Sequence, residues 1–223
     1  MDKIAFIFSG QGAQYSGMGK ALYTCSPAAR RVFDMADRIR PGTSRQCFDG
    51  TPEELTVTEN TQPCIFCVDL AAAAALGEAG IKADMLAGFS LGEIAALAYS
   101  GAVTYESGFE LVCRRAQHMQ KASQKAPAAM AAVLKLSDDE VVALTKEFDY
   151  VYAVNFNSPG QVVVSGPPDA LEAFKTRVRD AGGKAMPLKV SGGFHSPFMA
   201  PASDAFMKEL DAFTISPPSV SLY

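Results

Sequence analysis

Histidine is scarce in this sequence, which has only His118 and His195 among its 223 residues. Histidine is the commonest metal ligand and the side chain that most often acts as a general base near neutral pH. No group of histidine, cysteine, aspartate and glutamate residues has the spacing of a metal-ligand set, so we expect no metal site. Any reaction that needs a histidine base must use one of these two positions.

Long apolar runs, a secretory signal and an excess of positive charge are also missing. The longest apolar candidate, residues 68–76, contains Asp69 and is too short to span a membrane. A strand pattern starts at Lys3 with no signal peptide before it. The net charge of −4 argues against non-specific binding of nucleic acid. We therefore expect a cytoplasmic, monomeric protein with no membrane or nucleic-acid partner.

The five cysteines are an odd number and lack the spacing of a disulfide framework, which fits a reducing compartment. Cys64 and Cys67 form a C-x-x-C pair after Pro63, at an expected helix start. A redox role is one interpretation of this pair. The pattern favours the other, two small apolar residues on one helix face, because buried cysteine behaves as a small hydrophobic side chain.

The most informative stretch is Gly88-Phe89-Ser90-Leu91-Gly92, which fits the G-x-S-x-G pattern of a nucleophile elbow. A short apolar segment precedes it, and apolar residues at helical spacing follow it, so the context is strand, turn and helix. The two glycines lack a Cβ and allow the strand and the helix to pass close to the serine. Backbone N–H groups at the helix start can hold the oxyanion that forms when Ser90 attacks a carbonyl. The alternative is a chance match in a glycine-rich loop.

The remaining pattern predicts an α/β protein with an inserted subdomain. Long helices are expected at 17–40 and 63–77, and a glycine-rich loop, Ser9 to Gln14, follows the first strand. No G-K-[ST] follows that loop, so it is not a Walker loop. Between Pro127 and Ser191 the pattern changes to β-α-β-β-α-β, the ferredoxin-like order. We expect an α/β-hydrolase-like core with a parallel sheet and a nucleophile elbow in residues 1–127 and 191–223, and a ferredoxin-like α+β subdomain in residues 128–190.

His195 is the better candidate for the general base. It lies in a glycine-rich loop between elements, whereas His118 lies in the middle of a predicted helix, and loops carry catalytic groups more often. A serine hydroxyl is a poor nucleophile unless such a base removes its proton. The order serine then histidine matches that of α/β-hydrolases. The alternative for His195 is a structural role at the Pro197 turn. No motif marks an acidic third member.

Six short motifs follow one another along the chain. They are Gly10-Gln11-Gly12-Ala13-Gln14, Thr61-Gln62-Pro63, Gly88-Phe89-Ser90-Leu91-Gly92-Glu93, Arg115 with Met119, Asn155-Phe156-Asn157-Ser158-Pro159-Gly160-Gln161, and Gly193-Phe194-His195-Ser196-Pro197. They occur in the order seen in malonyl-CoA:acyl-carrier-protein transacylases of fatty-acid synthesis. The chain resembles that family, and the related acyltransferase domains of polyketide synthases, over its whole length.

The resemblance implies a role for each matched residue. Ser90 is the expected nucleophile and His195 the expected base, with the amides of Gln11 and Leu91 as the oxyanion hole. Arg115 is expected to clamp the malonyl carboxylate, for which a guanidinium offers a planar fork. Taken alone, Arg115 would be read as part of a solvated helix face.

The implied reaction is transfer of a malonyl group from malonyl-CoA to the phosphopantetheine thiol of an acyl carrier protein, without a metal or other cofactor. Phe194 resembles the residue found in malonyl-selective polyketide acyltransferases, and we expect it in the acyl pocket. The alternatives are a serine esterase or phospholipase-like hydrolase, and a non-catalytic fragment that binds the carrier protein.

Two features depart from the family pattern. Phe89 stands where the family usually has a histidine before the nucleophile. Family members also continue past Tyr223, and the residue whose carbonyl orients the histidine lies there. We expect a protein ending at Tyr223 to be inactive and prone to aggregation, or to be a remnant of a longer chain. If His195 is instead oriented from within the chain, Asn155 and Asn157 are the nearest candidates.

Overall fold

The computed structural model describes residues 3–190 and 192–223, which form two compact units. The first unit consists of Met1–Gln117 and Phe206–Tyr223, and the second of His118–Ala205. These divisions fall at 117 and 205, whereas the sequence pattern placed the domain boundaries at 127 and 190. The predicted domain boundaries therefore remain a proposal about which segments fold independently.

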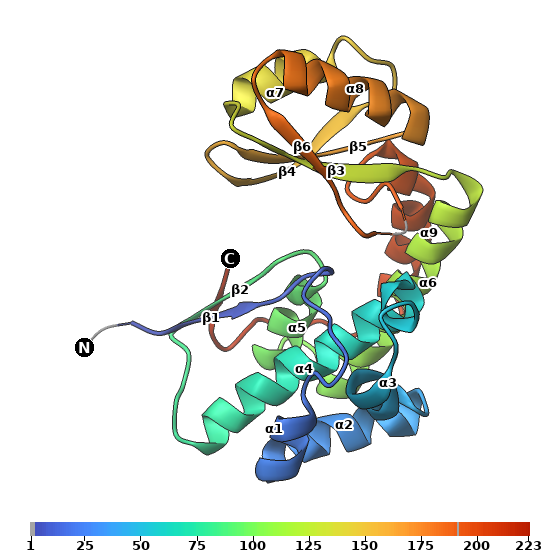
Figure 1. The fold of residues 1–223 in the computed structure, drawn as a ribbon. Helices are drawn as coiled ribbons and strands as arrows, with labels where there is room; N and C mark the ends of the chain where they lie inside the picture. Colours follow the sequence, from blue (N-terminus) through green and yellow to red (C-terminus); the bar gives the residue numbers. More distant parts are fainter. Residues whose placement is uncertain (1–2, 191) are drawn as a thin grey trace. The chain divides into compact units, whose positions relative to one another are not determined.

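The first unit is built on a parallel sheet with the strand order β1-β2-β7. Ala5 pairs with Met85 and Phe8 with Gly88, so β1 and β2 run side by side over four residues and end together (Figure 1). Parallel strands that end together place their following loops at one edge of the sheet, where α/β proteins bind ligands. The elements assigned to this unit are β1 (Ala5–Phe8), α1 (Lys20–Cys25), α2 (Pro27–Ile39), α3 (Thr43–Asp49), the 3-10 helix η1 (Glu54–Thr56), α4 (Thr58–Glu78), β2 (Met85–Gly88), α5 (Gly92–Tyr99), most of α6 (Tyr105–Lys125), the end of α9 (Ala200–Leu210) and β7 (Ser221–Leu222).

Helix α4 is the central element of this unit's core. It packs against α2, α3 and α5, and eleven of its residues are buried. Cys64 and Cys67 are both fully buried free cysteines among these residues, which agrees with their interpretation as small core side chains.

The prediction that α4 starts at Pro63 is wrong, because the helix begins five residues earlier, at Thr58. Pro63 lies inside the helix, where its missing N–H removes one backbone hydrogen bond. Burial of this segment in the core compensates for that loss, since Thr61, Gln62 and Pro63 are all buried.

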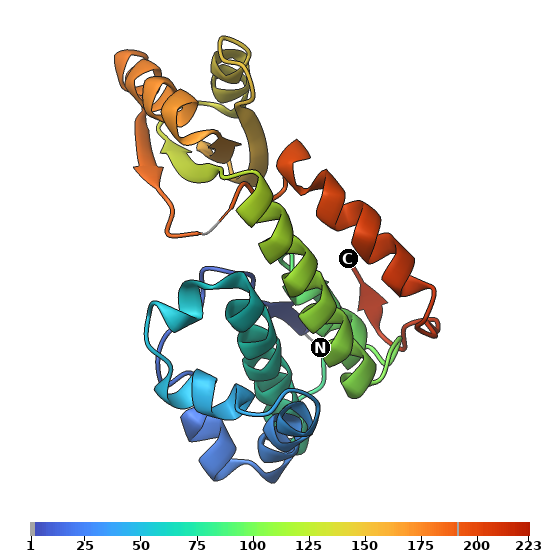
Figure 2. The ribbon, with the colours of Figure 1, turned by 90° about the vertical axis from the view of Figure 1, so that its right-hand side faces the viewer.

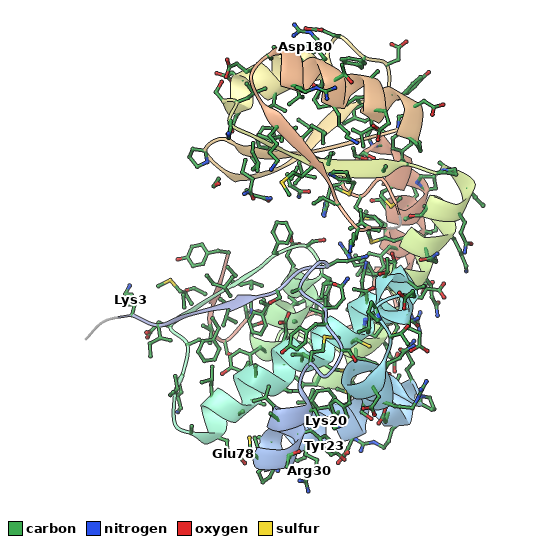
Figure 3. The ribbon with its side chains drawn as sticks, in the orientation of Figure 1. Lys3, Lys20, Tyr23, Arg30, Glu78 and Asp180 are labelled. Carbon is green, nitrogen blue, oxygen red and sulfur yellow. The ribbon has the colours of Figure 1, made fainter. Side chains whose placement is uncertain are left out.

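The helix predicted over residues 17–40 is also divided in the structure, into α1 and α2. Ser26 between them has an extended backbone (φ −119°, ψ 116°), the conformation that a following proline favours. Its side chain accepts a hydrogen bond from the Ala29 amide at 3.1 Å and caps α2. The Ser26 hydroxyl donates in turn to the Glu78 carboxylate at 2.6 Å, at the end of α4 where Figure 3 labels Glu78.

The second unit contains a four-stranded antiparallel sheet with the order β4-β5-β3-β6. The two helices α7 and α8 lie on one face of it (Figures 1 and 2). The chain order β-α-β-β-α-β with the first strand next to the third and fourth is the predicted ferredoxin-like arrangement. Its elements are β3 (Ala129–Leu134), α7 (Asp138–Thr145), β4 (Tyr152–Ser158), β5 (Gln161–Gly166), α8 (Pro168–Asp180), β6 (Lys184–Pro187) and, after the sheet, the 3-10 helix η2 (Pro197–Met199).

The predicted fold class is therefore confirmed: a parallel α/β sheet with an elbow serine, and a ferredoxin-like α+β sheet.

Candidate active site

Ser90 lies at a sharp turn between β2 and α5. Its φ of 57° is in the left-handed region, which costs free energy for a residue with a Cβ. The turn is held by backbone bonds: the Phe89 amide donates to the Phe8 carbonyl and the Gly92 amide to the Phe89 carbonyl, both at 3.0 Å. The predicted strand, turn and helix are all present, and the half-buried serine is presented at the end of β2.

The two glycines of the elbow are required by close backbone contacts. A Cβ on Gly92 would lie 2.3 Å from the Phe8 carbonyl oxygen, and a Cβ on Gly88 would lie 2.2 Å from the Glu93 nitrogen. Both distances are far below van der Waals contact, and the atoms met belong to the backbone. Glycine at these positions therefore allows α5 to start directly against β1 and β2.

Arg115 on α6 donates hydrogen bonds to two side chains of this unit. Its Nη2 lies 2.9 Å from the Oγ of Ser90, and its Nη1 lies 2.8 Å from the Oε1 of Gln62 on α4. A guanidinium presents its donors in a fixed fork, so a bond on one side sets the direction of the other. Gln62 is fully buried and holds the fork against the serine.

Burial lowers the pKa of Arg115 from its ordinary value, and the negative charge of Glu93 opposes that shift. An arginine nevertheless keeps its proton at neutral pH. The serine hydroxyl therefore lies next to a desolvated positive charge. Such a charge attracts an incoming carboxylate more strongly than a solvated one would.

Gln11 lies in the loop that follows β1, and Leu91 directly follows Ser90 at the elbow. Among residues 3–190 and 192–223, the backbone amide of neither residue donates a hydrogen bond. The Leu91 amide is at the start of α5, where the helix dipole adds to its positive character. The Gln11 side chain is anchored separately, since its Nε2 donates to the Thr58 hydroxyl at 3.4 Å.

His195 and Phe194 belong to the second unit. His195 is exposed and has a φ of 60°, so it too has a left-handed backbone. The following turn is closed by two bonds: the Ser196 hydroxyl donates to the Gly193 carbonyl at 2.5 Å, and the Met199 amide donates to the Ser196 carbonyl at 2.9 Å. This turn presents the imidazole at the surface of its unit.

Phe194 is only 5% exposed, and its ring packs in a cluster of buried residues of the second unit. The other buried members of this cluster are Met119, Ala122, Met130, Val163, Met199 and Ala202. The ring therefore has a packing role in addition to the selectivity role that the sequence predicts for it.

Three further residues of the family motifs are Phe89, Asn155 and Asn157. The Phe89 ring is 48% exposed and lies against Gly10, where a Cβ would be 2.3 Å from its Cδ1 atom. Asn157 donates from Nδ2 to the Oε1 of Gln161 at 3.2 Å, and Asn155 pairs with Val163 in the sheet. The suggestion that either asparagine orients His195 stays a prediction.

Sequence reasoning did not assign a role to Gln62 or Thr58. Gln62 was part of a family motif, yet no local pattern indicates that its side chain meets Arg115, 53 positions later. Only the structure shows that the Gln62 amide is buried and therefore needs hydrogen-bond partners.

Residues 3–190 and 192–223 contain no group of three or more histidine, cysteine, aspartate or glutamate side chains that could hold a metal ion. No helix in this part of the chain is long and apolar enough to cross a membrane.

Comparison with known proteins gives a consistent result. Residues 5–223 match the acyl transferase domain family. The chain is 40% identical over 226 residues to the malonyl CoA-acyl carrier protein transacylase of Bacillus subtilis (strain 168), covering 99% of this chain and 71% of that protein. The solved transacylase of Clostridium perfringens superposes with a TM-score of 0.91 at 35% identity, covering 99% of this chain and 71% of that one.

A malonyl-transacylase solved in complex with a type II polyketide-synthase acyl-carrier protein superposes with a TM-score of 0.94 at 32% identity, covering 99% of this chain and 74% of that one. The chain therefore belongs to the acyl transferase domain family, the family of the malonyl CoA-acyl carrier protein transacylases.

Proposed function

We propose that this protein transfers a malonyl group from malonyl-CoA to the phosphopantetheine thiol of an acyl carrier protein, through a malonyl-serine on Ser90. The observation that carries the proposal is the hydrogen bond between Arg115 and Ser90 at 2.9 Å. A malonyl group bound to the serine ends in a carboxylate a few bonds from Oγ. A partly buried guanidinium beside that oxygen provides a bidentate partner for it.

The first half-reaction forms the acyl-enzyme. His195 takes the proton from the Ser90 hydroxyl while Oγ attacks the thioester carbon of malonyl-CoA. The amides of Gln11 and Leu91 donate to the oxyanion, and each such donor is worth about 3 kcal/mol in the transition state. The C–S bond then breaks, and the CoA thiolate leaves with the proton that the imidazolium returns.

The second half-reaction reverses these steps with a different thiol. The phosphopantetheine thiol of the carrier gives its proton to His195 and attacks the malonyl-serine. Collapse of the tetrahedral intermediate releases the serine, which regains the proton. Relatives named for transfer to acyl carrier protein, and the relative solved with such a carrier, support this acceptor. The proposed reaction needs no cofactor beyond the thioester donor and the thiol acceptor.

The test is the mass of the intact protein after mixing with malonyl-CoA. We expect an increase by one malonyl group on the wild type and no increase on Ser90→Ala. Addition of phosphopantetheinylated carrier protein should then remove the group from the enzyme and place it on the carrier. Release to water at the same rate without a thiol would instead indicate a hydrolase, and carrier binding without any acylation would indicate a non-catalytic binding protein.

A further inference from the structure

The Arg115 guanidinium is held at both of its terminal nitrogens, and one of the two partners is Gln62. Nη1 donates to the Gln62 Oε1 at 2.8 Å, while Nη2 donates to the Ser90 Oγ at 2.9 Å. Because a guanidinium is planar and its donors form a rigid fork, the two bonds together fix its position and its plane. The bond to Gln62 therefore helps to determine where Nη2 points.

Gln62 is the more rigid member of this pair. It lies in the second turn of α4, and its side chain is 0% exposed between two buried neighbours, Thr61 and Pro63. Side chains in a close-packed interior are confined to one rotamer. Arg115 is only half-buried, and an arginine side chain loses much rotamer freedom when it is ordered. The buried glutamine thus sets the conformation of the longer side chain.

The amide of Gln62 holds the arginine without neutralising it. A carboxylate at this position would pair with Arg115 and oppose the approach of a second carboxylate. A neutral carbonyl acceptor leaves the positive charge for an anionic ligand. That charge is directed at the Ser90 oxygen, to which the acyl group of the proposed reaction is attached.

Formation of the acyl-enzyme changes the surroundings of Nη2 and leaves the bond to Gln62 in place. A guanidinium has five N–H donors, so Arg115 can bind the malonyl carboxylate while Nη1 still donates to Gln62. An acetyl group has no carboxylate and makes no use of the directed fork. The support that Gln62 provides therefore matters for one class of acyl group and not for the other.

We propose that Gln62 is a positioning residue, which sets the preference for acyl groups that end in a carboxylate by holding the Arg115 fork toward Ser90. This inference rests on the proposed function and deepens it, since it assigns acyl selectivity to a residue that acts through the arginine. Selectivity is a difference between two free energies, so the ratio of two substrates reports it where the rate with one substrate does not.

The test compares kcat/KM for malonyl-CoA and acetyl-CoA in wild type, Gln62→Met, Gln62→Glu and Gln46→Met. Gln62→Met keeps the chain length and loses the carbonyl acceptor. We expect its malonyl-to-acetyl ratio to fall by about 10-fold or more, with the value for acetyl-CoA within about threefold of wild type. Gln62→Glu keeps an acceptor but adds a charge that pairs with Arg115, so its ratio should also fall by about 10-fold.

Gln46→Met is the matched control. Gln46 on α3 also holds an arginine, because its Oε1 accepts a bond from the Arg40 Nη1 at 2.8 Å. Its loss removes the same kind of bond from the same unit and should leave the malonyl-to-acetyl ratio within about twofold of wild type. An Arg115→Ala/Gln62→Met double variant should have the ratio of Arg115→Ala alone, because Gln62 acts through the arginine.

A wild-type ratio in folded Gln62→Met protein would overturn the proposal, as would equal losses for the two acyl groups or a further fall of the ratio in the double variant. If thermal unfolding shows that Gln62→Met does not fold, Gln62→Glu decides, and a wild-type ratio there contradicts the proposal. A wild type that forms no malonyl-serine would refute the proposed function. A wild type that prefers malonyl-CoA, with Gln62 variants that keep this preference, would refute only the role of Gln62.

Discussion

Arg115 and Ser90, 25 positions apart in the chain, are joined by a hydrogen bond of 2.9 Å from Nη2 to Oγ. The serine accepts this bond, so its own proton remains available to a base. The same guanidinium is held from its other side by Gln62. The proposed nucleophile and the proposed anion-binding group thus share one corner of the first unit, and most of the predictions below concern this site and its supports.

Replacing Arg115 with alanine should abolish malonyl transfer and spare acetyl transfer. An acetyl group has no carboxylate, whereas a malonyl carboxylate without its partner should lose about 2–5 kcal/mol of binding. The measurement is kcat/KM for both acyl-CoA substrates. Arg114→Ala is the control, because that neighbouring arginine pairs with Glu110 and Glu209. Equal losses for the two acyl groups in Arg115→Ala would assign Arg115 a structural role.

Gly92→Ala should destabilise the fold and remove acylation, because the added Cβ would meet the Phe8 carbonyl at 2.3 Å. Overpacking against backbone costs about 1–3 kcal/mol or more. Gly77→Ala in α4 is the matched glycine, since its Cβ would meet only the Tyr99 hydroxyl at 3.9 Å. That variant should gain about 0.5–1 kcal/mol from the lower chain entropy. Urea unfolding measures both, and a neutral Gly92→Ala would contradict the close packing of the elbow.

Phe194→Ser should have two separable effects. Loss of a buried ring lowers stability by about 3–5 kcal/mol, which thermal unfolding measures. If the ring also lines the acyl pocket, the ratio of kcat/KM for methylmalonyl-CoA to that for malonyl-CoA should rise, since one methyl group is worth about 1–3 kcal/mol of discrimination.

Phe156→Ser serves as the control for the phenylalanine substitution, because its ring is 55% exposed and its loss should change stability little. An unchanged substrate ratio in folded Phe194→Ser protein would limit Phe194 to core packing.

Asp69 should make stability depend on pH in the direction opposite to that of most carboxylates. Its pKa is raised to about 7 in the folded state, against about 3.9 in an unfolded chain. Between these values the folded protein holds a proton that the unfolded chain has released, so the free energy of unfolding falls as the pH rises from 4 to 7 and then stays level.

The comparison that isolates this effect is urea unfolding of wild type and Asp69→Asn at pH 5 and pH 8. The stability of Asp69→Asn relative to wild type should increase with pH, by an amount on the order of 2–3 kcal/mol at most. A gap that is equal at both pH values would show that the carboxyl group is not desolvated.

The buried thiols should resist alkylation in the folded protein. Burial raises the pKa of Cys67, and it raises that of Cys113 to about 12, so little thiolate is present at neutral pH. Cys25 is exposed and should react with iodoacetamide first. Peptide mapping after brief labelling measures this order. Early modification of Cys64 or Cys67 would revive the redox interpretation of the C-x-x-C pair.

The local patterns of the sequence were sufficient for the strand, turn and helix of the elbow. Local partners act directly on the backbone elsewhere too: Thr51 and Glu54 bond reciprocally, at 3.2 and 3.0 Å, because both lie within one turn. Where local signals were misread, tertiary packing explains the difference. Pro63 suggested a helix start, yet the buried Thr58–Glu78 segment stays helical through it.

By itself, the sequence determined the strand, turn and helix around Ser90, the order of the second sheet's elements, and which residues resemble family motifs. Those features depend on neighbours a few positions apart, where periodicity, glycine and proline act directly on the backbone. Only the tertiary structure decided that Gln62 holds Arg115 against Ser90 and that Thr58 accepts a hydrogen bond from the Gln11 side chain. These contacts join residues 25 to 53 positions apart, and they arise because α4 lies beside the loop that follows β1 and packs against α5, a relationship that no local pattern contains.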